Sequence, residues 1–195
     1  MMSLSGENSY VSLSGSSTTC GECLKMSPPY DRVISAFHYE PPVSDFITQL
    51  KYSAQLQLLP LLSEYLTQKI QSSYPTSTLP ELIIATPLHP KKLVSRGFNQ
   101  SRLIANKVGK VLKIKILDKG VDRLKQTQAQ SGLDSVERKK NMKNAFQVET
   151  DLPQHVAVVD DVVTTGMTAS ELSKQLLKHG AKKVDIWCLA RAYGL

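Results

Sequence analysis

The sequence predicts an α/β fold, with a mostly parallel β-sheet flanked by helices. Short uncharged apolar runs, at residues 82–86 and 156–159, have the pattern of strands that are buried on both faces of a sheet. Stretches with apolar residues at helical spacing alternate with such runs, which is typical of parallel strands joined by helices. A chain of 195 residues is long enough to bury one sizeable core and to carry a small appendage.

The first part of the chain predicts a strand followed by two helices. Residues 33–39 have the character of a short strand, which the Pro-Pro pair at residues 41–42 ends, and this pair also suits the start of a helix. The helix is predicted from apolar residues at helical spacing, namely Val43, Phe46, Ile47 and Leu50. Leucine-rich residues 56–71 predict a second helix, in which Pro60 fits only near the first turn. Residues 72–80 form a polar linker.

After the apolar run at residues 82–86, the sequence predicts a loop, a helix and another strand. Residues 87–92 contain two prolines and are interpreted as a loop. Residues 99–113 predict an amphipathic helix, and residues 114–117 a short strand. The predicted apolar side of this helix consists of Leu103, Ile104, Val108, Val111 and Leu112. Residues 118–144 are polar, basic and rich in glutamine, with little periodicity, which is typical of a functional loop.

The last part of the chain predicts a strand, a turn, a helix and a final strand. The run at residues 156–159 precedes a predicted helix at residues 168–179, which Gly180 ends. Residues 184–189 predict the final strand. Because open parallel sheets bind their ligands beyond the carboxyl ends of the strands, the residues that follow positions 86 and 159 are candidates for a site.

The formal charge of +7 is unevenly distributed along the chain. Residues 86–145 hold fifteen Lys and Arg against four Asp and Glu, a balance of +11, whereas the remainder holds nine against thirteen, a balance of −4. Such a basic region can bind nucleic acid or a polyphosphate, or it can consist of solvated helix faces. The sequence shows neither a secretory signal nor the roughly 20 apolar residues of a membrane span, so we expect a cytoplasmic location.

Two adjacent carboxylates, Asp160 and Asp161, follow the apolar run, and a Thr/Gly loop leads from them into the next helix. Unpaired amides at a helix N-terminus and the helix dipole favour a phosphate. The carboxylates would accept hydrogen bonds from sugar hydroxyls, directly or through Mg²⁺, which binds few carboxylates together with substrate oxygens. The implied ligand is a ribose 5-phosphate with further phosphate attached. The alternative is an ordinary strand–turn–helix with a solvated Asp pair.

The loop at residues 160–168 resembles the 5-phosphoribosyl 1-pyrophosphate (PRPP) loop of type I phosphoribosyltransferases. Over about residues 20–192 the chain resembles the ComF family, also called the ComFC/GntX group. Besides that loop, the matching segments are Cys20-Gly-Glu-Cys23-Leu, Pro28-Pro29-Tyr-Asp31-Arg-Val, Leu50-Lys51-Tyr52, Arg96-Gly97-Phe98-Asn99-Gln100-Ser101, Thr127-Gln-Ala-Gln130, Arg138-Lys-Lys-Asn141 and Asn144-Ala-Phe146. The resemblance implies a type I phosphoribosyltransferase fold and a role in natural competence, the handling of incoming single-stranded DNA.

The resemblance also implies a PRPP site that uses Mg²⁺, with Asp160 and Asp161 as candidate catalytic residues. The candidate phosphate-binding residues are Val163, Thr164, Thr165, Gly166, Met167, Thr168, Lys91 and Arg96. Solvated lysines, and a structural ion pair of Arg96, are the alternatives. Residues 118–144 would be a flexible hood that closes over the substrate, or a plain solvated loop. Its candidate nucleic-acid contacts are Arg138, Lys139, Lys140 and Lys143.

The chain departs from the family pattern at its cysteines. Family members usually carry further Cys-x-x-Cys pairs that form a zinc ribbon, but here Cys20, Cys23 and the distant Cys188 are too few for the four ligands of structural zinc. We therefore expect no zinc within one chain, although two chains could share one through Cys20 and Cys23. Cys188 and Trp187 lie in a predicted strand and are expected in the core. We therefore predict that the chain is divided into three parts: a Ser-rich leader (1–19), a remnant of a zinc-ribbon-like segment (20–40) and a phosphoribosyltransferase-like domain (41–195).

Two functions follow from these features. The chain could be a binding protein that holds PRPP and single-stranded DNA and works with other competence proteins. It could instead be an enzyme that transfers phosphoribosyl from PRPP to an unidentified nitrogen acceptor in nucleotide metabolism, by positioning and by charge stabilisation as pyrophosphate leaves. Phe98 and Phe146 are the aromatic residues that flank the basic region, so DNA binding is expected to depend on phosphate contacts more than on base stacking.

Overall fold

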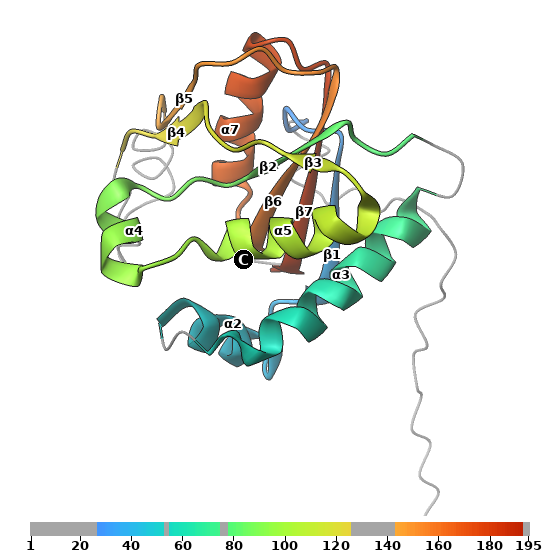
Figure 1. Ribbon diagram of the computed structural model, residues 1–195, viewed down its shortest axis with the longest axis vertical. Coiled ribbons are helices and arrows are strands. Elements are labelled where there is room, and N and C mark those ends of the chain that lie inside the picture. Colours follow the sequence, from blue (N-terminus) through green and yellow to red (C-terminus); the bar gives the residue numbers. More distant parts are fainter. Residues whose placement is uncertain (1–26, 53–54, 75–77, 126–142, 193–195) are drawn as a thin grey trace, which may run out of the picture.

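The computed structural model describes residues 27–52, 55–74, 78–125 and 143–192, which contain a parallel five-stranded sheet. All four neighbouring strand pairs are parallel. The strands, in their order across the sheet, are β1 (Arg32–His38), β7 (Lys183–Arg191), β6 (His155–Val163), β2 (Leu82–Ala85) and β3 (Lys115–Ile116) (Figure 1). The predicted α/β class with a mostly parallel sheet is therefore confirmed.

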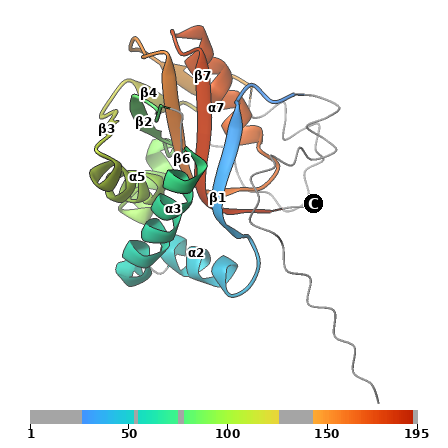
Figure 2. The same ribbon diagram turned by 90° about the vertical axis from the view of Figure 1, so that its right-hand side faces the viewer.

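Helices cover both faces of this sheet, as the view along it in Figure 2 shows. The α3 helix (Leu59–Ser73) and the α5 helix (Gln100–Leu112) pack on one face, and α7 (Met167–Lys178) packs on the other. The α2 helix (Val43–Tyr52) lies beyond the end of the sheet where β1 ends. A one-turn 3₁₀ helix (Leu56–Leu58) precedes α3, whose first turn contains Pro60 as predicted.

The side chains of the central strands alternate between two hydrophobic clusters. Val156 and Val158 of β6 pack on the α7 side, whereas Ala157 and Val159 pack on the side of α3 and α5. All four are buried, which accounts for the continuous apolar run in the sequence. Trp187 and Cys188 of β7 are fully buried, as predicted, and burial raises the pKa of the Cys188 thiol.

The structure corrects the prediction of a loop at residues 87–92. A short helix, α4 (Pro90–Arg96), begins there, with Pro90 in the first turn, where its missing N–H costs nothing. His89 caps this helix, because its Nδ1 accepts a hydrogen bond of 3.3 Å from the amide of Lys91. Gly97, at φ 80°, ends it.

Three further predictions need correction. Strand β6 does not end at Val159 but continues to Val163, because its ladder with β7 continues to the pair Val163 and Arg191. Residues 118–144 are not uniformly irregular: β4 (Val121–Arg123) lies within them and pairs antiparallel with β5 (Phe146–Val148). Val111 is 60% exposed and does not belong to the apolar side of α5.

No helix in the described ranges is long and apolar enough to cross a membrane.

Candidate functional site

The two carboxylates lie towards the carboxyl end of β6, at the centre of the sheet. Asp160 is half-buried, and its Oδ1 accepts hydrogen bonds from Ser101 Oγ at 3.0 Å and from the Asp161 amide at 2.9 Å. Asp161 is buried, and its Oδ2 lies 3.1 Å from Lys51 Nζ. The pair is therefore unequal: α2 supplies a cation to Asp161, whereas α5 supplies a hydroxyl to Asp160.

The charges of this pair alter the titration of the groups around it. Burial and, to a smaller extent, the charge of Asp161 raise the pKa of Asp160 to about 6. Burial by itself would lower the pKa of Lys51, but the charges of Asp161 and Asp160 outweigh it, so the pKa of Lys51 is raised. Lys51 consequently remains an ammonium ion at neutral pH.

Lys92 lies within electrostatic range of three other cations, and one of these, Arg123, also lies within range of Asp160. Burial lowers the pKa of Lys92, and the charges of Arg123, Arg96 and Lys51 lower it further. Burial also lowers the pKa of Arg123, whereas the charge of Asp160 raises it. Lys51, Lys92, Arg96 and Arg123, here called the cationic cluster, come from α2, α4 and β4. Two of the four, Lys51 and Arg123, interact electrostatically with the carboxylates, and Lys92 interacts with the other three cations.

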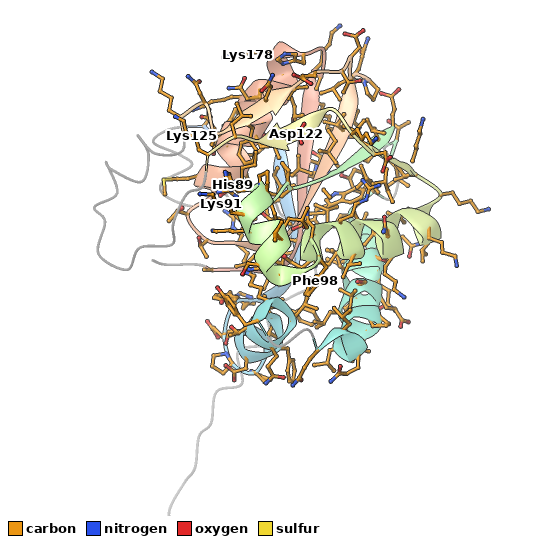
Figure 3. The ribbon with its side chains drawn as sticks, turned by 60° about the vertical axis from the view of Figure 1, so that its left-hand side comes forward. His89, Lys91, Phe98, Asp122, Lys125 and Lys178 are labelled. Atoms are coloured by element: carbon orange, nitrogen blue, oxygen red, sulfur yellow. The ribbon has the colours of Figure 1, made fainter. Side chains whose placement is uncertain are left out.

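Figure 3 shows α4 close to the β4–β5 hairpin. His89 and Lys91 lie at the start of α4, below Asp122 and Lys125 of the hairpin in that view, and Phe98 lies before the start of α5. The Lys91 side chain is exposed, and its neighbour Lys92 is more deeply placed and contributes to the cationic cluster.

The loop between β6 and α7 contains the predicted phosphate-binding residues. Thr164 and Thr165 are exposed, and Gly166 is the N-cap of α7 at φ 70°. The backbone conformation at Gly166 favours glycine, and a Cβ atom there would lie 2.9 Å from the Tyr30 hydroxyl, so the Tyr30 side chain would have to shift. Met167 and Thr168 form the first turn of α7, whose leading amides have no partner within the helix.

Asn99 fixes the start of α5 relative to the sheet. Its Oδ1 accepts hydrogen bonds from the amides of Ser101 and Arg102 at 3.0 and 3.3 Å. Its Nδ2 donates to the carbonyl of Thr86, directly after β2, at 3.0 Å. This cap therefore holds Ser101 where its hydroxyl reaches Asp160.

Comparison with known proteins identifies the family. DNA utilization protein YhgH of Escherichia coli strain K12 is 38% identical to this chain over 175 residues, which cover 88% of this chain and 77% of that protein. Competence protein F of Haemophilus influenzae is 37% identical over 179 residues, covering 89% and 78%. The chain belongs to the ComF family.

Two more distant similarities are also found. Competence protein ComFC of Streptococcus pneumoniae is 24% identical over 155 residues, covering 80% of this chain and 66% of that protein. A purine phosphoribosyltransferase from Pyrococcus horikoshii matches with a TM-score of 0.40 and 21% identity, covering 68% of this chain and 72% of its own. No protein-family model matches the chain.

The structure brings most of the predicted site residues of this ComF protein to one end of the sheet. The acidic pair, the loop after β6 and α4 with Arg96 all lie there. Lys143 is exposed before β5, and its carbonyl accepts a hydrogen bond of 2.6 Å from Lys125 Nζ. Three of the predicted nucleic-acid contacts lie outside the described residues, namely Arg138, Lys139 and Lys140. Cys20 and Cys23, which two chains could share as zinc ligands, also lie outside them.

Sequence reasoning missed three residues of the site. Lys51 and Ser101 stand within segments that match the ComF family, and this match was the available signal for them. Arg123 lies in a stretch that predicts no element, and its approach to Asp160 depends on the β4–β5 hairpin. Nothing in the local sequence indicates that contact.

Proposed function

We propose that this chain binds PRPP together with Mg²⁺ at Asp160, Asp161 and the loop at residues 164–168, and that it handles imported single-stranded DNA in natural competence. The observation that supports PRPP is the carboxylate pair, which interacts with Lys51 and Arg123, just before the loop that leads into α7. Lys92 extends this positive charge to α4, because it lies within electrostatic range of the other three cations of the cationic cluster. The phosphates of such a ligand match the excess of positive charge, and its ribose hydroxyls match the carboxylates.

Each part of the ligand has a chemically matched group in this proposal. The 5-phosphate would accept hydrogen bonds from the amides at the start of α7 and from the hydroxyls of Thr164 and Thr165. Asp160, the less buried carboxylate, would accept a hydrogen bond from a ribose hydroxyl. Lys92 and Arg96 of α4, with Arg123, would face the pyrophosphate.

The acidic pair also fits Mg²⁺ carried by the ligand. The described part of the chain contains no group of three His, Cys, Asp or Glu side chains that could hold a metal ion by themselves. Mg²⁺ usually binds through one or two carboxylates together with waters and substrate phosphate oxygens, which agrees with a carboxylate pair beside a polyphosphate. When bound, the ion would neutralise part of the charge of the pyrophosphate.

Calorimetric titration with PRPP and Mg²⁺ tests this site. The wild-type protein should bind, and the double variant Asp160→Asn, Asp161→Asn should not. Because Asp161→Asn removes the partner of Lys51, the single variant Asp160→Asn is the second test, and circular dichroism should show that it is folded. Asp151→Asn, which alters an exposed carboxylate, is the matched control and should bind as wild type does. Undiminished affinity in Asp160→Asn and in the double variant would contradict the assignment.

The DNA-handling part rests on the charge of residues 86–145 and on the names of the relatives. Binding dominated by phosphate contacts weakens steeply as salt rises, because bound Lys and Arg displace condensed counterions. Fluorescence anisotropy with a labelled single-stranded oligonucleotide should show this dependence, and the triple variant Arg138→Gln, Lys139→Gln, Lys140→Gln should reduce its slope. A binding curve that is flat in salt would contradict it.

The cationic cluster also favours a second candidate, transfer of phosphoribosyl from PRPP to a nitrogen acceptor. Positive groups at the pyrophosphate would stabilise the charge that develops as it leaves. Release of pyrophosphate in the presence of nucleobases, absent in Asp160→Asn, would establish turnover. PRPP binding without release would leave the binding protein as the function.

A further inference from the structure

Tyr52, the last residue of α2, has an unusually exposed aromatic ring for a position beside a buried ion pair. Its relative exposure is 77%, although the preceding residue, Lys51, lies 3.1 Å from Asp161. Aromatic side chains contribute most when they are covered, so a ring left open at the rim of a site is a candidate contact for a ligand.

Arg96 holds this ring next to the cationic cluster. The Cζ atom of Arg96 lies 5.5 Å from the centroid of the Tyr52 ring, within the range of a cation–π interaction. The same guanidinium donates a hydrogen bond to Gln100 Oε1, which fixes it between α4 and α5. The ring is therefore placed against a cation, while most of its surface remains open to solvent.

The fold places an aromatic side chain beside the basic region, whose own sequence contains few. Between residues 86 and 145 aromatic residues are scarce, and this favoured phosphate contacts alone for nucleic-acid binding. The structure brings Tyr52 from α2 to the basic helix α4, which also exposes Leu93 and Val94, by 43% and 84%. An open aromatic ring among cations is the combination with which proteins bind single-stranded nucleic acids.

We propose that Tyr52, backed by Arg96, is a stacking platform for a nucleobase. The inference rests on the proposed function, because the cationic cluster beside the ring is the part of that site which would hold the phosphates of the same ligand. A planar, uncharged base matches the ring, and its phosphates match the cations, so one ligand satisfies both. The base has two sources: a base of single-stranded DNA, or a free base that accepts phosphoribosyl.

The first experiment separates base contacts from phosphate contacts. Fluorescence anisotropy compares a thymidine oligonucleotide with an abasic oligonucleotide of the same length. The wild-type protein should bind the thymidine strand more tightly by roughly 5- to 100-fold, the range that one stacked base contributes. Tyr52→Ala should lose most of this preference, Tyr52→Phe should keep it, and the salt dependence should not change in Tyr52→Ala, because phosphate contacts set it. Tyr65→Ala, at a half-exposed tyrosine on α3, is the control and should retain the preference.

The second experiment distinguishes the two sources of the base. The chain has one tryptophan, Trp187, which is fully buried, so Tyr52→Trp adds a fluorophore at the rim of the site. Quenching by the oligonucleotide would identify DNA as the source, and quenching by a free nucleobase in the presence of PRPP and Mg²⁺ would identify an acceptor. Equal affinity of the wild type for both strands together with an unquenched Tyr52→Trp, or a preference that persists in Tyr52→Ala, would overturn the inference. Failure of wild-type PRPP binding in calorimetry would instead overturn the proposed PRPP site, since stacking of the oligonucleotide needs no PRPP.

Discussion

Lys51→Met tests whether the ion pair between α2 and β6 stabilises the fold. The substitution keeps the length of the side chain and removes the charge, which leaves the Asp161 carboxylate without its cation. Removing one partner of a buried ion pair typically costs about 3–5 kcal/mol. The Lys51 side chain is 22% exposed and that of Asp161 6% exposed, so solvent screens the pair in part.

Because the pair is only partly buried, we expect a loss at or somewhat below the bottom of this range, about 2–3 kcal/mol in the free energy of unfolding. For a chain of this size, that corresponds to a decrease of roughly 4–12 °C in melting temperature. Urea unfolding followed by Trp187 fluorescence measures the loss, because this buried residue is the single tryptophan of the chain. Lys69→Met, at an exposed lysine on α3, is the matched control and should change stability by no more than about 0.5 kcal/mol.

A double-mutant cycle decides whether the loss comes from this pair. Asp161→Asn removes the orphaned charge, so the double variant Lys51→Met, Asp161→Asn should be clearly more stable than the sum of the two single losses predicts. If the two losses simply add, within about 0.5 kcal/mol, the side chains are not coupled and the reasoning is refuted.

Three further predictions concern other parts of the molecule. Gly166→Ala should destabilise the fold by about 1–2 kcal/mol and weaken PRPP binding in calorimetry, because a Cβ at φ 70° is strained and would meet the Tyr30 hydroxyl; wild-type stability and affinity would contradict this. Tyr74→Phe should cost about 1–3 kcal/mol in urea unfolding, because the hydroxyl donates to the buried Asp185 and accepts from Trp187 Nε1 at 3.2 Å; an unchanged midpoint would argue against that network. Because the pKa of Asp160 is about 6, the native state binds a proton between about pH 4 and 6 that the unfolded state has lost. Stability should therefore fall as pH rises through this window, and Asp160→Asn should remove that fall; identical pH profiles would refute it.

The strands and long helices could be predicted because burial imposes a period on their sequences. Residues 82–85 and 156–159 are apolar at every position, because both faces of β2 and β6 are covered. The α4 helix could not be found in this way. It buries none of its residues, so its sequence has no apolar residues repeating at helical spacing. The local features that favour this helix are the N-cap at His89 and Pro90 in the first turn.

The sequence predicted the part of the candidate site that lies in one contiguous segment, but not the contacts between residues that are far apart along the chain. The acidic pair and the loop after it are contiguous, so their chemistry can be interpreted from the sequence alone. The pairing of Lys51 with Asp161, and of Tyr52 with Arg96, depends on how α2 packs against α4 and the end of β6. No local pattern encodes such contacts, because they join residues that are far apart along the chain.

The order of the strands has a consequence for how this protein is made. The first strand, β1, lies at one edge of the sheet and pairs with β7, the last, where Arg32 lies opposite Asp185. A ribosome releases β1 long before it releases its partner, and pairings this distant form late because the intervening chain must first be closed into a loop. The strand that carries the acidic pair, β6, also has β7 as one of its two neighbours. We therefore expect the sheet around the acidic pair to be completed only after Lys183–Arg191 has been synthesised, because β7 is a neighbour of both β6 and β1.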